Sequence, residues 1–107
     1  MAIDNRQKKR LRTIGHRLKP IVTIAGNGLT DTVLQEIKRA LNDHELIKIK
    51  LAITDREQRT VVTTQICEDT KAEIVQVTGK IALIYLAAPE PNTKLSNVNT
   101  HRVLGVA

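Results

Sequence analysis

Aromatic residues are almost absent from this chain of 107 residues: Tyr85 is the only one, and there is no Phe or Trp. Modules that stack several exposed bases on a platform of aromatic side chains, such as RRM and OB domains, cannot be built from this composition. If the chain binds a nucleic acid, the nucleic acid must therefore be held mainly through its backbone.

Cysteine is just as scarce. Cys67 is the single cysteine, so it has no partner for an internal disulfide or a zinc site, and this fits a packing role in a reducing compartment. No apolar run approaches the roughly 18 residues of a membrane span, and the N-terminus is charged, unlike a secretory signal. We expect a soluble, unexported, cytoplasmic protein.

The usual residue patterns of enzymes are also missing. His44 and Glu45 begin like the H-E-x-x-H motif of zinc proteases, but Lys48 occupies the place of the second histidine. His16 and His101 lie far from them in the sequence, and the carboxylates are scattered without a pair suited to acid/base catalysis. We therefore predict a protein that is not an enzyme and needs no metal, cofactor or small-molecule substrate.

What the chain does have is a positive charge gathered in one segment. Residues 1–19 contain seven bases against one acid, whereas residues 20–107 contain ten of each, so the net charge of +6 lies in the N-terminal segment. Blocks of one sign are often interaction surfaces, and a polyanion fits this one; the alternative is a face that only promotes solubility. The seven bases are Arg6, Lys8, Lys9, Arg10, Arg12, Arg17 and Lys19.

Apolar spacing predicts alternating helices and strands. The basic segment carries an apolar stripe that includes Leu11 and Ile14, and Asp4 or Asn5 can cap its helix. The expected order is a helix to about His16, a strand at 21–25, a turn at 25–28, a helix at 30–43, a strand within 44–53, a helix after Asp55 and a hairpin at 73–86 that turns at 78–80. In the second strand Ile47, Ile49 and Leu51 alternate with Lys48 and Lys50, so both lysines should point the same way.

The segment after Asp55 gives conflicting signals. Its residues TVVTTQI are rich in β-branched side chains, which favour strands, whereas Asp55 and Gln58 suit a capping box and Val62 and Ile66 share a helical face. We predict a helix because neighbouring parallel strands need a crossover connection. The result is a single α/β domain at residues 1–87, α-β-α-β-α-β-β, with helices packed against a four-stranded mixed sheet. A flexible tail should follow at 88–107, where two prolines and three asparagines stand without a sustained period.

The turn Ala25-Gly26-Asn27-Gly28 resembles a phosphate-binding loop only in part. It lacks the lysine of a Walker loop, and the dinucleotide fingerprint fails because Asp31 replaces the third glycine. What remains is an open turn followed by a helix N-terminus, which attracts phosphate, as the GXXG loop of KH domains does with an RNA backbone. The other interpretation is a tight turn that needs glycine only for a positive φ.

Three motifs together identify a family. The segments LKPIVTIAGNGLT (18–30), HELIKIK (44–50) and VQVTGKIALIYL (75–86) resemble the CRM domain, the chloroplast RNA splicing and ribosome maturation module, in its stand-alone bacterial, YhbY-like form. The resemblance covers about residues 6–86. It implies an RNA-binding fold like the C-terminal domain of bacterial initiation factor three, and an association with precursors of the large ribosomal subunit. The chain departs from the family at Ala25, where the G-x-x-G loop has its first glycine, and at Leu86, where an arginine is common.

The sequence thus predicts a monomeric RNA-binding protein that acts on ribosomal RNA during assembly of the large subunit. We expect the basic helix and the glycine turn to lie side by side and form one continuous cradle for the RNA backbone. Two alternatives remain: a protein–protein adaptor whose basic helix docks on an acidic partner, and a small nucleotide-binding protein. The predicted RNA-binding residues are the seven N-terminal bases, the turn residues Ala25, Gly26, Asn27 and Gly28, and Lys48 and Lys50.

Overall fold

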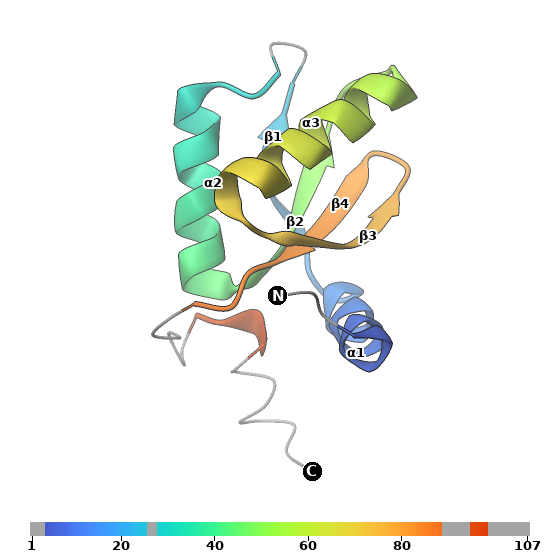
Figure 1. Cartoon of the computed structure of the whole chain (residues 1–107), viewed down its shortest axis with the longest axis vertical. Coiled ribbons are helices and arrows are strands. Elements are labelled where there is room, and N and C mark those ends of the chain that lie inside the picture. The colour runs from blue at the N-terminus through green and yellow to red at the C-terminus, as the bar shows by residue number, and fades with distance from the viewer. Residues whose placement is uncertain (1–3, 26–27, 89–94, 99–107) are drawn as a thin grey trace.

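The computed structural model describes residues 4–25, 28–88 and 95–98, and within them the helices and strands follow the predicted order (Figure 1). The helices are α1 (Asn5–Gly15), α2 (Asp31–His44) and α3 (Arg56–Thr70), and the strands are β1 (Pro20–Ile24), β2 (Leu46–Leu51), β3 (Glu73–Thr78) and β4 (Ile81–Tyr85). No helix in this part of the chain is long and apolar enough to cross a membrane.

The strands form one mixed sheet in the order β1-β2-β4-β3. β1 and β2 are parallel, while β4 runs antiparallel to both β2 and β3. The predicted four-stranded mixed sheet is therefore confirmed. β1 and β3 are its edges, and β3 carries a register shift between Ile74 and Gln76.

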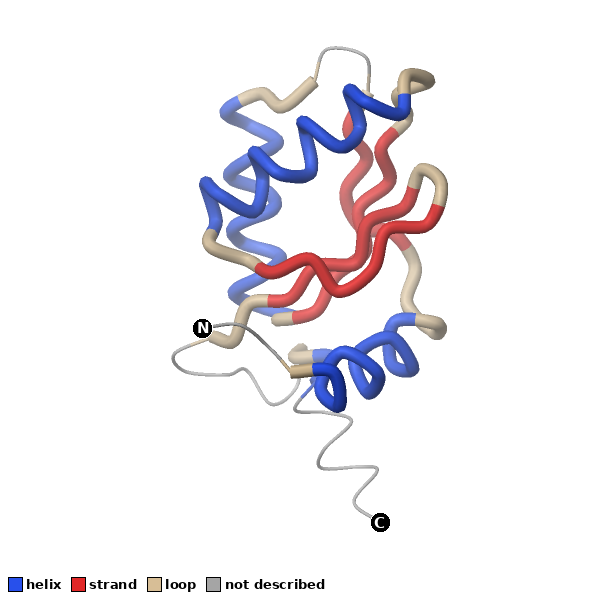
Figure 2. The backbone as a smooth tube through the Cα atoms, turned by 45° about the vertical axis from the view of Figure 1, so that its right-hand side comes forward, coloured by secondary structure: helices blue, strands red, loops and turns tan. Residues whose placement is uncertain are grey.

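Helices α2 and α3 lie on one face of the sheet, which we call the covered face (Figure 2). Ile37 and Leu41 from α2 and Val62 and Ile66 from α3 pack in one buried cluster with strand residues such as Ile49. These helical residues recur at a spacing of four, so each helix presents one apolar stripe to the strands. This cluster is the main core of the domain.

Helix α1 packs on the opposite face, and only near one end of it. Leu11 and Ile14 join a second, smaller cluster with Leu83 and with Val98 from the C-terminal segment. Gly15 allows close approach, because a Cβ atom there would lie 2.5 Å from the Leu83 side chain. The strand residues on this side that α1 leaves uncovered form what we call the open face: Lys48, Lys50, Gln76, Thr78 and Ile81.

Helix α3 forms despite its β-branched residues. The hydroxyls of Thr63 and Thr70 donate to the carbonyl groups four residues before them, at 2.8 and 2.7 Å, so these buried polar groups are satisfied inside the helix. Asp55 is the N-cap, as predicted, but its carboxylate accepts the N–H of Glu57 at 3.0 Å rather than forming the predicted box with Gln58. Burial of one helical face outweighs the local strand preference here.

Glu45, between α2 and β2, is buried at 2% exposure and has a positive φ of 64°. Its carboxylate accepts the backbone N–H of Ala88 at 2.9 Å and the hydroxyl of the fully buried Ser96. A buried carboxylate must be hydrogen-bonded to be tolerated, and the C-terminal segment supplies these donors.

Further contacts hold the same segment. The Nδ1 of His44 donates to the carbonyl of Leu95 at 2.8 Å, and the side-chain amide of Asn97 donates to the carbonyl of Leu46 at 2.6 Å. Val98 is 2% exposed. Residues 95–98, which fall within the predicted flexible tail at 88–107, thus pack on the domain; residues 89–94 and 99–107 lie outside the described part of the chain, and the tail as a whole stays a prediction.

Candidate nucleic-acid interface

Helix α1 separates its apolar residues from its cationic ones. Asp4 and Gln7 close its N-terminus with a capping box, in which the Asp4 carboxylate accepts the Gln7 N–H at 2.8 Å. Leu11 and Ile14 are buried against the sheet, so the bases occupy the remaining sides. Of the seven predicted bases, Arg6, Lys9, Arg10, Arg17 and Lys19 are exposed, and Lys8 and Arg12 are half-buried.

Lys48 and Lys50 extend the positive charge onto the open face. Lys48 pairs with Leu83 and Lys50 with Ile81 across β2 and β4, and directly opposed residues of an antiparallel pair share a face. Ile49, between the two lysines, lies in the main core on the covered face. The prediction that both lysines point the same way is confirmed.

A groove of about 300 Å³ joins the end of α1 to this face. His16, the C-cap of α1, lies on one side of it, and the half-buried Lys48 lies on another. The structure therefore brings the carboxyl end of the basic helix and the first of the two strand lysines into one surface. The residues that line the groove are His16, Lys48, Gln76, Thr78, Ile81 and Leu83.

Sequence reasoning missed Gln76 and Thr78. Plain alternation along β3 would put them on the same face as Ile74, but the bulge between Ile74 and Gln76 moves them to the other face. Gln76 consequently pairs with Leu83 on the side of α1. An inserted residue of this kind leaves no signal in a period-two pattern.

The structure describes the glycine turn at its two ends, Ala25 and Gly28. The N–H of Gly28 donates to the carbonyl of Ala25 at 2.9 Å, which closes the turn, and its φ is +76°. A Cβ atom added there would meet nothing within 4 Å. Thr30 then caps α2. Residues 26 and 27, which complete the predicted loop, lie outside the described part of the chain.

The expectation of one continuous cradle is wrong. In Figures 1 and 2 helix α1 lies at the lower end of the molecule, whereas β1 rises from it toward the upper end, where α2 begins. The turn between β1 and α2 is thus separated from α1 by a five-residue strand, or roughly 16 Å at the usual rise per residue. Because an extended strand lies between the two features in the chain, it holds them apart.

Titratable side chains offer little chemistry beyond charge. Among residues 4–25, 28–88 and 95–98, no three His, Cys, Asp or Glu side chains are placed to hold a metal ion. Burial raises the pKa of the Cys67 thiol from 9.0 to about 11, so almost none of it is the nucleophilic thiolate at neutral pH. His44 is engaged with the Leu95 carbonyl, and His101 is not described.

A basic helix beside the open face of a small mixed sheet is the arrangement of an α/β domain that binds a polyanion. The chain belongs to the CRS1 / YhbY (CRM) domain family, whose model matches residues 3–85. The resemblance seen in the sequence is thereby confirmed. The sequence also predicts a binding protein rather than an enzyme, and the names of the relatives support that prediction.

Two bacterial relatives align over nearly their whole length. The chain is 48% identical over 99 residues to a protein of Pseudomonas aeruginosa named a probable RNA-binding protein. This alignment covers 92% of this chain and 95% of the relative. The chain is also 43% identical over 93 residues to an RNA-binding protein of Haemophilus influenzae, in an alignment that covers 87% of this chain and 94% of that relative. The solution structure of a candidate RNA-binding protein from Staphylococcus aureus superposes with a TM-score of 0.74 at 27% identity, covering 89% of this chain and 98% of that one.

Proposed function

We propose that this protein binds RNA through its sugar-phosphate backbone, using the basic sides of α1 together with the open face of the sheet. The observation that carries the proposal is the division of α1 into a buried apolar stripe and a set of mostly exposed bases. That division fixes the direction in which the charge points. The family and the names of the aligned relatives support RNA as the polyanion.

The proposed target is ribosomal RNA in precursors of the large ribosomal subunit, bound by a cytoplasmic monomer that assists assembly. The resemblance to CRM modules of ribosome maturation supports this target. Cosedimentation tests it: in a low-salt gradient of a cell extract, the protein should travel with immature large subunits. Sedimentation only at the top of the gradient would contradict the ribosomal target while leaving RNA binding itself open to the test below.

Phosphate contacts orient a protein on RNA without reading the bases, so specificity should come mainly from the shape of the RNA. The surface of α1 meets the open face at the groove between His16 and Lys48. The glycine turn stands apart from this surface, and we assign it a second, separate phosphate contact at the N-terminus of α2.

Salt dependence of binding tests the proposal. If about five phosphates are neutralised, the slope of log K against log salt should be near −3.5. Changing Lys9 and Arg10 to Gln should reduce the magnitude of that slope by about 1.4, because two contacts are lost. Fluorescence anisotropy with a labelled RNA hairpin measures both quantities.

A matched pair on another helix provides the control. Lys38 and Arg39 are also adjacent and exposed, but they lie on α2. Their change to Gln removes the same net charge and should leave the slope almost unaltered. Equal effects of the two double variants would mean that only net charge matters. A flat salt response of the unaltered protein, with tight binding to an acidic protein instead, would favour the adaptor.

A further inference from the structure

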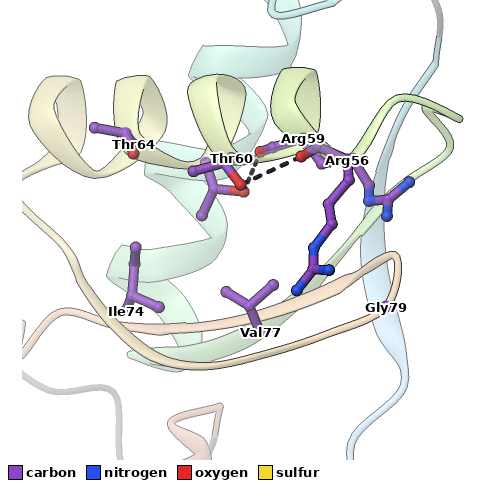
Figure 3. A pocket seen from close by; sticks show the side chains of 8 residues that line it. Arg56, Arg59, Thr60, Thr64, Ile74, Val77 and Gly79 are labelled. Carbon is purple, nitrogen blue, oxygen red and sulfur yellow. Dashed lines mark hydrogen bonds between the residues drawn. The ribbon is translucent and has the colours of Figure 1, made fainter.

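A second groove lies between α3 and the edge strand β3, on the side of the sheet opposite to α1 (Figure 3). Its volume is about 470 Å³, within the range of small-ligand pockets. In Figure 3 arginine and threonine side chains from α3 form one wall, and Ile74 and Val77 from β3 form the other. Among the described residues, those that line it come from α3, β3 and the turn after β3, and none comes from the basic helix.

The β3 wall is apolar and exposed. Ile74 is 38% exposed and Val77 is 51% exposed, although they pair with Ile84 and Ala82, which are buried in the main core. The apolar surface of the core therefore continues outward onto β3, where α3 does not cover it. Exposed aliphatic side chains beside a groove provide a surface on which a flat apolar ring can pack.

The α3 wall is polar, and its polar groups have defined roles. Arg59 donates through Nη1 to the carbonyls of Ile53 and Thr54 at 2.7 and 2.9 Å, so it is held in place. Arg56 is exposed at the start of α3. It can therefore pair with an anion that enters the groove, through the two parallel N–H groups of its guanidinium.

Two hydroxyls on the same wall, the exposed Thr60 and the buried Thr63, donate within α3. Thr60 donates to the carbonyl of Arg56 at 3.2 Å, and Thr63 donates to the carbonyl of Arg59 at 2.8 Å. Each hydroxyl has only one proton, so in this arrangement its oxygen is left to accept from a ligand N–H. The groove thus offers an apolar wall, a cation and hydrogen-bond acceptors close together.

We propose that this groove binds a single unpaired nucleotide of the RNA. The base packs against Ile74 and Val77 and donates from its N–H groups to the threonine hydroxyls, while an adjoining phosphate pairs with Arg56. Unpaired, splayed-out bases are the parts of an RNA that proteins read most specifically, and apolar side chains can pack against such a base where aromatic side chains are scarce. The inference rests on the proposed RNA binding and adds to it a preference for unpaired regions.

The two grooves lie on either side of β3, which supports a shared ligand. Gln76 and Thr78 line the groove on the open face, whereas Ile74 and Val77 line this one. β3 is an edge strand, so an RNA backbone that crosses the open face can pass around that edge and place its next unpaired base in the second groove.

A matched pair of valine variants tests the proposal. Val77 in the groove and Val61 on α3 outside it are both exposed, at 51% and 59%. Val77→Glu and Val61→Glu add the same charge, and both should leave the thermal melting temperature near that of the unaltered protein. Each variant is titrated with an RNA hairpin that has an unpaired loop and with a duplex of the same stem.

We expect Val77→Glu to weaken binding of the looped RNA by about tenfold, the scale of losing one packed base, and to leave duplex binding nearly unchanged. Val61→Glu should alter neither. In NMR spectra the methyl signals of Ile74 and Val77 should shift with the looped RNA but not with the duplex. Equal behaviour of the two variants, or methyl signals that shift only with an acidic peptide, would overturn the nucleotide site while RNA binding stands. Failure of the unaltered protein to bind either RNA would overturn both.

Discussion

The two faces of the sheet differ in how completely they are covered, and the difference separates stability from binding. α2 and α3 close the covered face around a large apolar cluster. α1 covers only part of the other face, with a smaller cluster completed by Val98. Along β2, Ile49 belongs to the first face while Lys48 and Lys50 belong to the second. One strand therefore carries core residues and candidate binding residues in alternation.

The largest expected effect comes from breaking the covered face. Ile49 is fully buried there, so Ile49→Ala removes buried methyl groups and leaves a cavity. The free energy of unfolding should fall by about 2–5 kcal/mol, a large share of the 5–15 kcal/mol typical of a domain. Urea unfolding followed by circular dichroism measures the loss. A loss below about 1 kcal/mol would mean that this face is less tightly packed than described.

The next largest effect should come from removing the hydrogen bonds of Glu45 to the C-terminal segment, which brings Val98 into the smaller cluster. Glu45→Ala removes an acceptor of the part-buried Ala88 N–H and of the buried Ser96 hydroxyl, and the loss of these hydrogen bonds should cost about 2 kcal/mol in the free energy of unfolding. Glu36→Ala, at an exposed position of α2, is the control and should cost much less.

A double-mutant cycle sharpens this test. If Glu45 holds the C-terminal segment through Ser96, the losses from Glu45→Ala and Ser96→Ala should not add, because both remove the same interaction. Additive losses in urea unfolding would show that the two residues act independently.

The two faces also explain what the sequence could and could not predict. The apolar stripes of α1 and α2 and the alternation in β2 depend on local spacing, so the elements, the mixed sheet and the direction of Lys48 and Lys50 followed from the sequence. The shift in β3 and the docking of Ser96 depend on contacts across more than 40 residues or on one inserted residue. The position of the glycine turn relative to α1 does not follow from the charge pattern, although the length of the strand between them is enough to keep the two apart.

A smaller effect is expected from the two lysines of β2, which should contribute to RNA binding but not to stability. Changing Lys48 and Lys50 to Gln should leave the free energy of unfolding within about 0.5 kcal/mol, because both side chains retain solvent contact. Binding of an RNA hairpin should weaken by several-fold, with the magnitude of the salt slope reduced by about 1.4. Anisotropy titrations at several salt concentrations measure this change. Unaltered binding would limit the interface to α1.

The smallest expected effect concerns the glycine turn, which lies at the other end of β1 from the basic helix. Gly28 and Gly79 both have positive φ, at 76° and 56°, and a Cβ atom at either would meet open space. Asn tolerates such torsions better than other side chains, so Gly28→Asn and Gly79→Asn should alter the free energy of unfolding little and equally.

Duplex RNA separates the two glycine variants, because a paired stem offers no unpaired base to the groove beside Gly79. A second phosphate contact at the turn predicts that only Gly28→Asn weakens duplex binding, by about two- to threefold, as expected for partial loss of one backbone contact. The loss is small because α1 supplies most of the charge at the far end of β1. A loss as large as that from changing Lys9 and Arg10 would instead mean that the turn is the main contact and that the open face is secondary.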